Sequence, residues 1–158
     1  MRIEYGKVMP AAIEAMVGLQ AAADHGGLEP KLVELVKVRA SQLNGCAHCL
    51  DMHTKDARSI GEDEQRLQVL AAWREAPFYN QRERAALAWC ESLTMLSETG
   101  APDNVYTELT AHFSPEEIVA LTLQVVAINS WNRLAVGFRT PVGTYVSRRQ
   151  PEGANARP

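Results

Sequence analysis

The stretch E-L-V-K-V-R-A-S-Q-L-N-G-C-A-H-C-L-D-M-H, residues 34–53, holds the densest group of reactive side chains in the sequence. Its first half predicts a well-buried helix beginning at Pro30, because apolar residues lie on more than one of its sides. Asn44-Gly45 is a turn signal that ends this helix. A second helix is then expected over residues 46–60. The stretch therefore predicts two consecutive helices joined by a tight turn.

The second of these helices carries two thiols and an imidazole on one face. At about 100° per residue, Cys46, Cys49 and His53 fall within an arc of roughly 60°, while His48 points to the side. A C-x-x-C pair can close a short disulfide, and the thiolate is the nucleophilic form of cysteine. His53 follows Cys49 by four residues, so it can accept the Cys49 proton or stabilise the thiolate. This pattern predicts thiol chemistry.

The rest of the chain predicts an all-α fold in a single domain over residues 1–145, with residues 146–158 as a mobile C-terminal tail. Ser114-Pro115-Glu116-Glu117 combines a cap, a proline at the first helical position and acids against the helix dipole. The helix after it, residues 118–138, is apolar nearly all round and is expected in the core or at a subunit interface. Further helices are predicted over residues 11–23, 63–75, 80–100 and 102–112.

Composition excludes several classes of protein. A formal net charge of −3 and a pI near 5.8 give no support for nucleic-acid binding. No apolar run approaches the roughly 20 residues that span a membrane. Three cysteines are too few, and odd in number, for a disulfide-rich secreted scaffold. A reducing, cytoplasmic location is therefore expected.

Three other interpretations of the cysteines are weaker. C-x-x-C is half of many zinc sites and His53 could be a third ligand, but Cys90 and His112 are isolated in the sequence. A thioredoxin-like fold would place C-x-x-C in a βαβ pattern, which is not found around this pair. Two buried cysteines could pack as small hydrophobic residues, although a C-A-H-C stretch followed by a histidine favours chemistry. Cys90, on an apolar helix face, is expected to be inert core.

Residues 34–53 as a whole resemble the core motif of the alkylhydroperoxidase AhpD-like branch of the carboxymuconolactone decarboxylase family. The motif has a glutamate, Glu34, twelve residues before the first cysteine, then C-x-H-C, then His53 four residues after the second cysteine. The stretch I-N-S-W-N-R-L-A, residues 128–135, also resembles the last core helix of that family. The resemblance covers roughly residues 14–145 and implies an AhpD-like helical bundle.

The resemblance implies a thiol-dependent peroxidase that uses no metal and no cofactor. Cys49 would reduce a hydroperoxide and become a sulfenic acid, which Cys46 would convert to a Cys46–Cys49 disulfide. Glu34, His53 and a bridging water would form a proton relay, with His48 assisting. An external dithiol, of the lipoyl or thioredoxin type, would reduce the disulfide. The resembled family also implies a homo-oligomer, a trimer or a hexamer built from trimers.

Some questions stay open. The helix dipole favours Cys46 as the activated thiol, whereas proximity to His53 favours Cys49; we assign peroxide attack to Cys49 and exchange with the reductant to Cys46.

Two alternative functions are a carboxymuconolactone decarboxylase-type lyase and a non-enzymatic redox-responsive module. Lys37 and Arg39 are expected to pair with acids on neighbouring helices. Trp131, with Asn129 and Asn132, could line the site or an interface, and packing is the favoured role.

Overall fold

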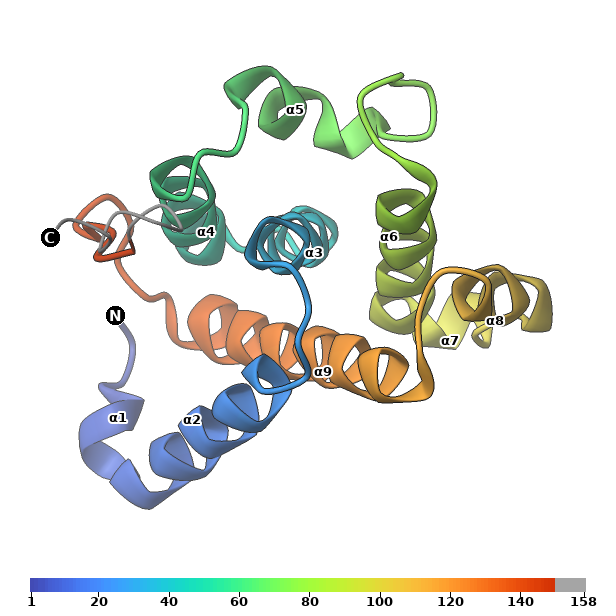
Figure 1. Cartoon of the computed structure of the whole chain (residues 1–158). Helices are drawn as coiled ribbons and strands as arrows, with labels where there is room; N and C mark the ends of the chain where they lie inside the picture. Colours follow the sequence, from blue (N-terminus) through green and yellow to red (C-terminus); the bar gives the residue numbers. More distant parts are fainter. Residues whose placement is uncertain (150–158) are drawn as a thin grey trace, which may run out of the picture.

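The computed structural model describes residues 1–149, and over this range the regular secondary structure is helical (Figure 1). The predicted all-α fold in one domain is confirmed. The elements are α1 (Tyr5–Val8), α2 (Pro10–Asp24), α3 (Pro30–Leu43), α4 (Ala47–Ser59), α5 (Glu64–Val69), the 3-10 turn η1 (Leu70–Ala72), α6 (Gln81–Thr94), α7 (Leu96–Thr99), α8 (Asp103–Thr110) and α9 (Pro115–Phe138).

Helix α3 is the centre of the bundle. Figure 1 shows it end-on, with α4, α6 and α9 around it. Leu35, Val36 and Ala40 are completely buried, as expected for a helix that is apolar on several sides. Each polar side chain that is buried on α3 must find a partner inside the protein. This requirement matters because α3 also carries Glu34 and Lys37.

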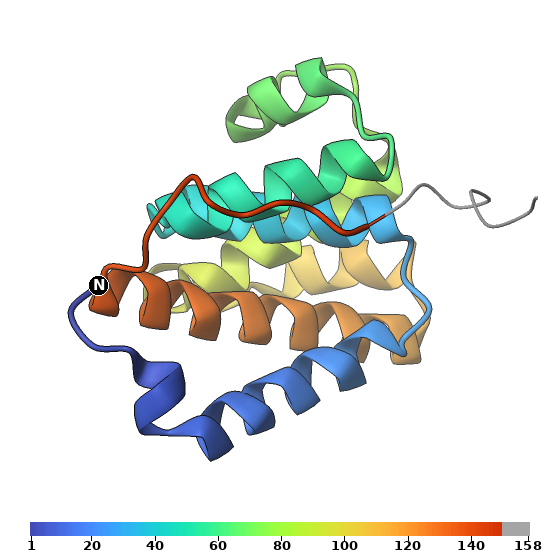
Figure 2. The same ribbon diagram turned by 90° about the vertical axis from the view of Figure 1, so that its left-hand side faces the viewer.

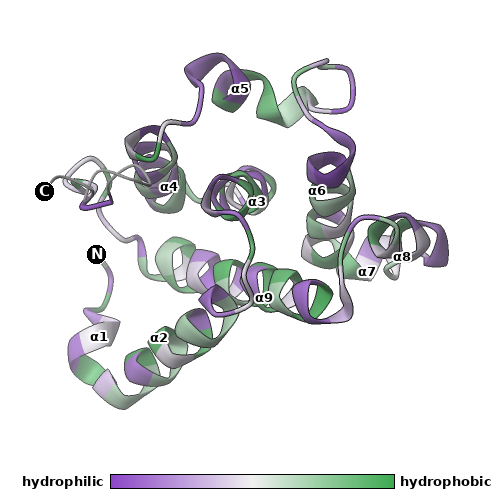
Figure 3. Cartoon of the chain, in the orientation of Figure 1, coloured by the Kyte–Doolittle hydropathy of each residue, from purple (hydrophilic) through white to green (hydrophobic). Residues whose placement is uncertain are grey.

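Helix α9 crosses beneath α3 and contacts α2, α4 and α6 as well. Its start is the predicted one: Ser114 and Glu117 form a reciprocal capping box, and Pro115 occupies the first helical position. Figure 3 shows its mainly hydrophobic colouring. Nevertheless, no helix within residues 1–149 combines the length and the apolar character needed to cross a membrane.

The predicted helix over residues 80–100 is divided in two. The Asn80–Glu83 capping box starts α6 as expected, but the chain turns at Met95 and resumes as the short α7. This turn lets the Thr99 hydroxyl donate to the Ser92 carbonyl at 2.7 Å, which satisfies an acceptor in the last turn of α6. The helix predicted over residues 63–75 is shorter than expected and consists of α5 followed by η1. Helix α1 was not predicted.

The C-terminal segment, residues 141–149, lies alongside α4 (Figure 2). Lys55 donates to the Tyr145 carbonyl at 2.9 Å, and the Tyr145 and Ser147 hydroxyls donate to Asp56 at 2.8 and 2.6 Å. Residues 146–149 of the predicted tail therefore contact the body of the protein. The rest of that tail, residues 150–158, lies outside the described residues.

Substitution of Gly26 tests how closely α2 approaches α9. An added Cβ at Gly26 would overlap the Ala120 side chain on α9, so we expect Gly26→Ala to destabilise the protein by about 1–3 kcal/mol. Gly18 lies within α2 with nothing within 4 Å of the corresponding position. Gly18→Ala should therefore be neutral or stabilise by about 0.5–1 kcal/mol. Urea denaturation of both variants provides the measurement, and equal effects would contradict the close approach.

Candidate active site

The two cysteines begin α4. Cys46 is the N-cap residue and its sulfur accepts a hydrogen bond from the Cys49 backbone N–H at 3.3 Å. The two sulfurs are paired as a disulfide across a Cα–Cα distance of 5.4 Å. Both residues are buried. The tight turn at Asn44-Gly45, where Gly45 adopts a positive φ of 62°, aims the start of α4 back toward α3 and α9.

Glu34 on α3 and His53 on α4 form a buried pair. His53 Nδ1 lies 2.8 Å from Glu34 Oε2, and Glu34 is completely inaccessible to solvent. Burial raises the pKa of the Glu34 carboxyl, but the hydrogen bond from His53 and the charges of Lys37 and Arg149 outweigh it, so the net pKa is lowered. Ionised Glu34 can only accept, so Nδ1 carries the proton and Nε2 remains the basic nitrogen.

A pocket of about 410 Å³ opens beside Cys49. Its walls come from α1, α2, α3, α4, α9 and the C-terminal segment. The lining residues that carry polar or reactive groups are Tyr5, Gln20, Lys37, His48, Cys49, Met52, His53, Asp56, Trp131, Tyr145 and Arg149. Cys49 and His53 thus share one pocket, with Glu34 buried behind His53.

Cys46 faces a separate hollow of about 190 Å³ on the other side of the turn. The walls of that hollow are Gly45, Cys46, Ala47, His48, Ala135, Val136, Arg139, Thr140 and Val142. His48 lines both spaces, and its Nδ1 lies 2.7 Å from the Pro141 carbonyl. Since a carbonyl only accepts, this His48 nitrogen is the donor. Cys46 and Cys49 therefore line different spaces, although both residues are buried.

The structure brings four further residues to the site that the motif does not include. The Asp56 carboxylate accepts a hydrogen bond from the Tyr145 hydroxyl, and its Oδ2 lies 3.8 Å from Arg149 Nε. Arg149 Nη1 lies 3.3 Å from Glu34 Oε1. Lys37 Nζ is 3.7 Å from the same Glu34 oxygen. Asp56 follows His53 by three residues and Lys37 follows Glu34 by three, so helical spacing could have indicated both. No local pattern indicates the arrival of residues 145 and 149.

The geometry disfavours a metal centre. Donor atoms of Glu34, His53 and Asp56 lie within 4.8 Å of one another, which is close enough for a shared cation. However, the Lys37 ammonium and the Arg149 guanidinium already face these carboxylates and would repel one.

Trp131 and Cys90 have different environments. Trp131 is half-buried and lines the Cys49 pocket rather than only packing in the core. Cys90 is buried in the core, where loss of hydration raises the pKa of its thiol to about 12. A thiol with that pKa contributes almost no thiolate at neutral pH, so Cys90 is an internal control for the reactive pair.

Arg39 has the structural role expected of it. Its Nε donates to Glu91 on α6 at 2.7 Å, and Trp73 Nε1 donates to the same carboxylate at 2.8 Å. Burial raises the pKa of the Glu91 carboxyl, but the hydrogen bonds from Trp73, Arg74 and Arg39 have the larger effect. The net pKa of Glu91 is therefore lowered. The network ties α3, η1 and α6 together.

These lowered pKa values predict that acid destabilises the protein. Glu34 and Glu91 titrate below their ordinary value of 4.5 in the folded state. The stabilisation is therefore complete above the unfolded-state pKa and is lost as the pH falls through the lower folded-state pKa. We expect the urea concentration at the midpoint of unfolding to decrease as the pH is lowered from about 5 to about 3. The decrease should be smaller in Glu91→Gln. An identical decrease in the variant would contradict a role for Glu91.

Comparison with known proteins identifies relatives of this chain. The model of the carboxymuconolactone decarboxylase family matches residues 10–92. The uncharacterized protein YdfG of Bacillus subtilis is 39% identical over 137 residues, covering 87% of this chain and 93% of YdfG. A crystal structure of a protein of unknown function from Agrobacterium tumefaciens, described as a candidate antioxidant defence protein AhpD, is 46% identical with a TM-score of 0.87, covering 91% of this chain and 99% of that one.

A more distant structure shares the fold. The debrominase Bmp8 superposes with a TM-score of 0.76 at 20% identity, covering 85% of this chain and 73% of Bmp8. At that identity the likeness concerns the arrangement of helices alone.

Proposed function

The chain belongs to the carboxymuconolactone decarboxylase family, and we propose that within it the protein is a thiol-dependent peroxidase of the alkylhydroperoxidase type. The observation that carries the proposal is the Cys46–Cys49 pair placed one helical turn from a buried Glu34–His53 pair. A thiol beside a base that is itself oriented by a carboxylate is the arrangement of an activated nucleophile.

In the proposed reaction, His53 Nε2 takes the Cys49 proton and the thiolate attacks the terminal oxygen of a hydroperoxide. An S–O bond forms, the O–O bond breaks, and the departing alkoxide takes a proton to leave as an alcohol. Cys46, as thiolate, then attacks the Cys49 sulfenic acid; the S–S bond forms and hydroxide leaves, protonated to water. Glu34 keeps His53 in the required tautomer throughout.

An external dithiol of the lipoyl or thioredoxin type completes the proposed cycle by thiol–disulfide exchange. We propose that the reductant attacks Cys46, which lines a hollow other than the Cys49 pocket. Reduced thiols persist in a reducing compartment, so we also propose a cytoplasmic location. His48, which lines both spaces, is proposed to assist proton transfer at either thiol.

Intact-mass spectrometry tests the function. Reduced protein treated with one equivalent of cumene hydroperoxide should lose two hydrogens and two titratable thiols, while Cys90 stays free because its thiol has a pKa of about 12. Turnover should then follow on addition of dihydrolipoamide or reduced thioredoxin. Unchanged thiols, under conditions in which a control peroxidase consumes the peroxide, would exclude the peroxidase.

Family membership also supports a second candidate function, a cofactor-independent lyase acting on a lactone acid. That chemistry would not require a redox disulfide. A Cys46/Cys49 double variant distinguishes the two functions. Turnover of a carboxymuconolactone by this variant favours the lyase. If neither the variant nor the wild-type protein turns over the lactone, the lyase is excluded.

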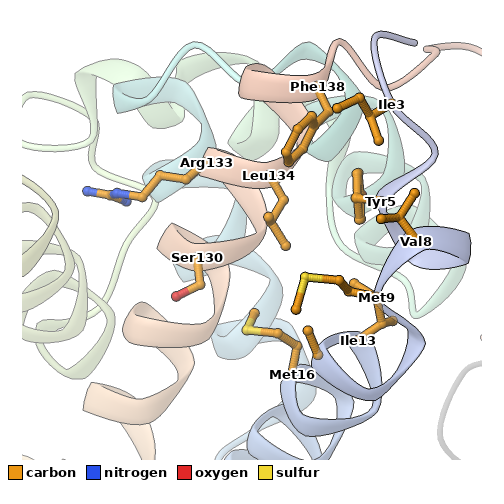
Figure 4. A pocket seen from close by; sticks show the side chains of 11 residues that line it. Ile3, Tyr5, Val8, Met9, Ile13, Met16, Ser130, Arg133, Leu134 and Phe138 are labelled. Atoms are coloured by element: carbon orange, nitrogen blue, oxygen red, sulfur yellow. The ribbon is translucent and has the colours of Figure 1, made fainter.

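We propose that the protein is a homo-oligomer, because an apolar groove lies open on its surface; the resemblance to the AhpD-like branch implies a trimer or a hexamer. Figure 4 shows the groove between α1, α2 and the last turns of α9, and its volume is about 500 Å³. Its apolar walls include Ile3, Val8, Met9, Ile13, Met16, Leu134 and Phe138. An open apolar surface of this kind is typical of a face covered by another chain.

Light scattering should accordingly give a multiple of the 17.4 kDa chain mass. Met9 is 64% exposed at the groove, so Met9→Asp should shift the mass toward that of one chain. Leu96 is 54% exposed on α7, across the molecule from α1 (Figure 1), and Leu96→Asp provides the matched control. A wild-type protein with the mass of one chain would contradict the proposal.

A further inference from the structure

Lys37 is a buried ammonium in the wall of the reactive pocket. It lies one helical turn after Glu34 on α3 and is 3% exposed. Its side chain lines the same pocket as Cys49 and His53. A lysine is rarely buried to this degree unless it is paired, so its partners decide what it does.

The partners of Lys37 are incomplete. The nearest carboxylate oxygen, Glu34 Oε1, is 3.7 Å from Nζ, which is longer than a hydrogen bond. Within residues 1–149, this Glu34 oxygen is itself buried without a hydrogen bond. An ammonium has three N–H donors. Lys37 therefore has donor capacity left for a molecule that enters the pocket beside Cys49.

We propose that Lys37 is a further catalytic residue, which binds the leaving oxygen of the hydroperoxide and stabilises its developing negative charge. The proposal rests on the peroxidase function proposed above. A preorganised donor aimed at the atom where charge develops is worth most in a buried pocket, where water does not compete. The sequence alone had suggested only an ion-pairing role for this residue.

The step balances as follows. The Cys49 thiolate donates its electron pair to the terminal oxygen, so the S–O bond forms as the O–O bond breaks. The remaining oxygen leaves as an alkoxide hydrogen-bonded to Lys37 Nζ. The proton that His53 took from Cys49 then reaches the alkoxide, directly or through Lys37, giving the alcohol and neutral His53. Sulfur is oxidised and the peroxide is reduced.

Two other side chains with N–H donors at the pocket are less suited to this role. The Arg149 guanidinium lies between Glu34 Oε1 and the Asp56 carboxylate and is exposed at the surface. His48 donates its Nδ1 proton to the Pro141 carbonyl. Burial lowers the pKa of the Lys37 ammonium, while the Glu34 charge opposes that effect. A lowered pKa makes an ammonium a better proton donor to an alkoxide.

Comparing two reactions of reduced protein separates leaving-group stabilisation from thiol activation. Cumene hydroperoxide must expel an alkoxide, whereas iodoacetamide needs the same Cys49 thiolate but expels iodide. We expect Lys37→Met to slow oxidation by the peroxide by about 100-fold while changing alkylation less than about threefold. Lys31→Met, which removes an exposed charge from the same helix, should change neither rate. Lys37→Gln replaces Lys37→Met if the latter does not fold.

The basicity of the leaving group provides a second measurement. Peracetic acid expels weakly basic acetate, and tert-butyl hydroperoxide expels a strongly basic alkoxide. The loss in Lys37→Met should be at least about tenfold larger for tert-butyl hydroperoxide. Equal losses with both peroxides, or a parallel loss of alkylation, would overturn the proposal in favour of a structural or thiol-activating role. Failure of the peroxidase function is distinct, since wild-type protein itself would then leave both peroxides unreacted.

Discussion

Cys49→Ser is expected to lose its reaction with hydroperoxides, by at least about 1,000-fold relative to wild type. The reason is positional, because Cys49 is the thiol that shares a pocket with His53. A serine hydroxyl at the same place is far less nucleophilic than a thiolate. Stopped-flow measurement of peroxide consumption by reduced protein gives the rate, with Cys90→Ser as the control that should match wild type.

The complementary variant identifies the order of the two thiols. Cys46→Ser leaves the Cys49 pocket intact, so it should react once with peroxide and stop at a sulfenic acid that dimedone traps. Trapping in Cys49→Ser, and none in Cys46→Ser, would reverse the assignment. The helix dipole, which favours Cys46, would then outweigh proximity to His53.

Much of the helical frame could be predicted because its signals are local. Ser114 and Asn80 cap helices through side chains that act within three residues. The contact between Glu34 and His53 spans 19 residues, but it depends only on two helices folding back across the turn at Asn44-Gly45. The spacing within α4 predicted the position of His53, whereas the role of Glu34 came from the family resemblance and not from spacing.

The parts that could not be predicted depend on distant contacts. Tyr145 and Arg149 reach the site because residues 141–149 run along α4, with their backbone fixed by Lys55 and Asp51. A polar stretch after a proline carries no such information in its own sequence. The interruption at Met95 likewise depends on a hydrogen bond between Thr99 and Ser92 that helix propensity does not encode.

The assignment of different roles to Cys49 and Cys46 is part of the proposed function. Cys49 is among the residues that line the larger pocket, together with His53, Lys37 and Arg149. Cys46 is among the residues that line a smaller hollow at the end of α9. A peroxide is small and needs charge stabilisation, whereas a dithiol on a carrier needs access to one sulfur. We propose that these two encounters take place one helical turn apart.

Glu34→Gln is expected to slow the alkylation of Cys49 by iodoacetamide by about 100-fold or more near neutral pH. The carboxylate accepts the Nδ1 proton of His53 at 2.8 Å and thereby keeps Nε2 basic. A glutamine can offer its NH₂ group to the same nitrogen, which would stabilise the wrong tautomer. The pH dependence of the alkylation rate of reduced protein, followed by mass spectrometry, measures the effect.

Asp56→Asn is the matched control for that loss. Asp56 is also a buried carboxylate near Arg149, but its hydrogen bonds come from Tyr145 and Ser147 rather than from His53. Its alkylation rate should stay within a few fold of wild type. Comparable losses in both variants would show that the negative charge of the pocket matters, and not the orientation of His53. A wild-type rate in Glu34→Gln would remove the glutamate from the relay altogether, leaving His53 to act alone.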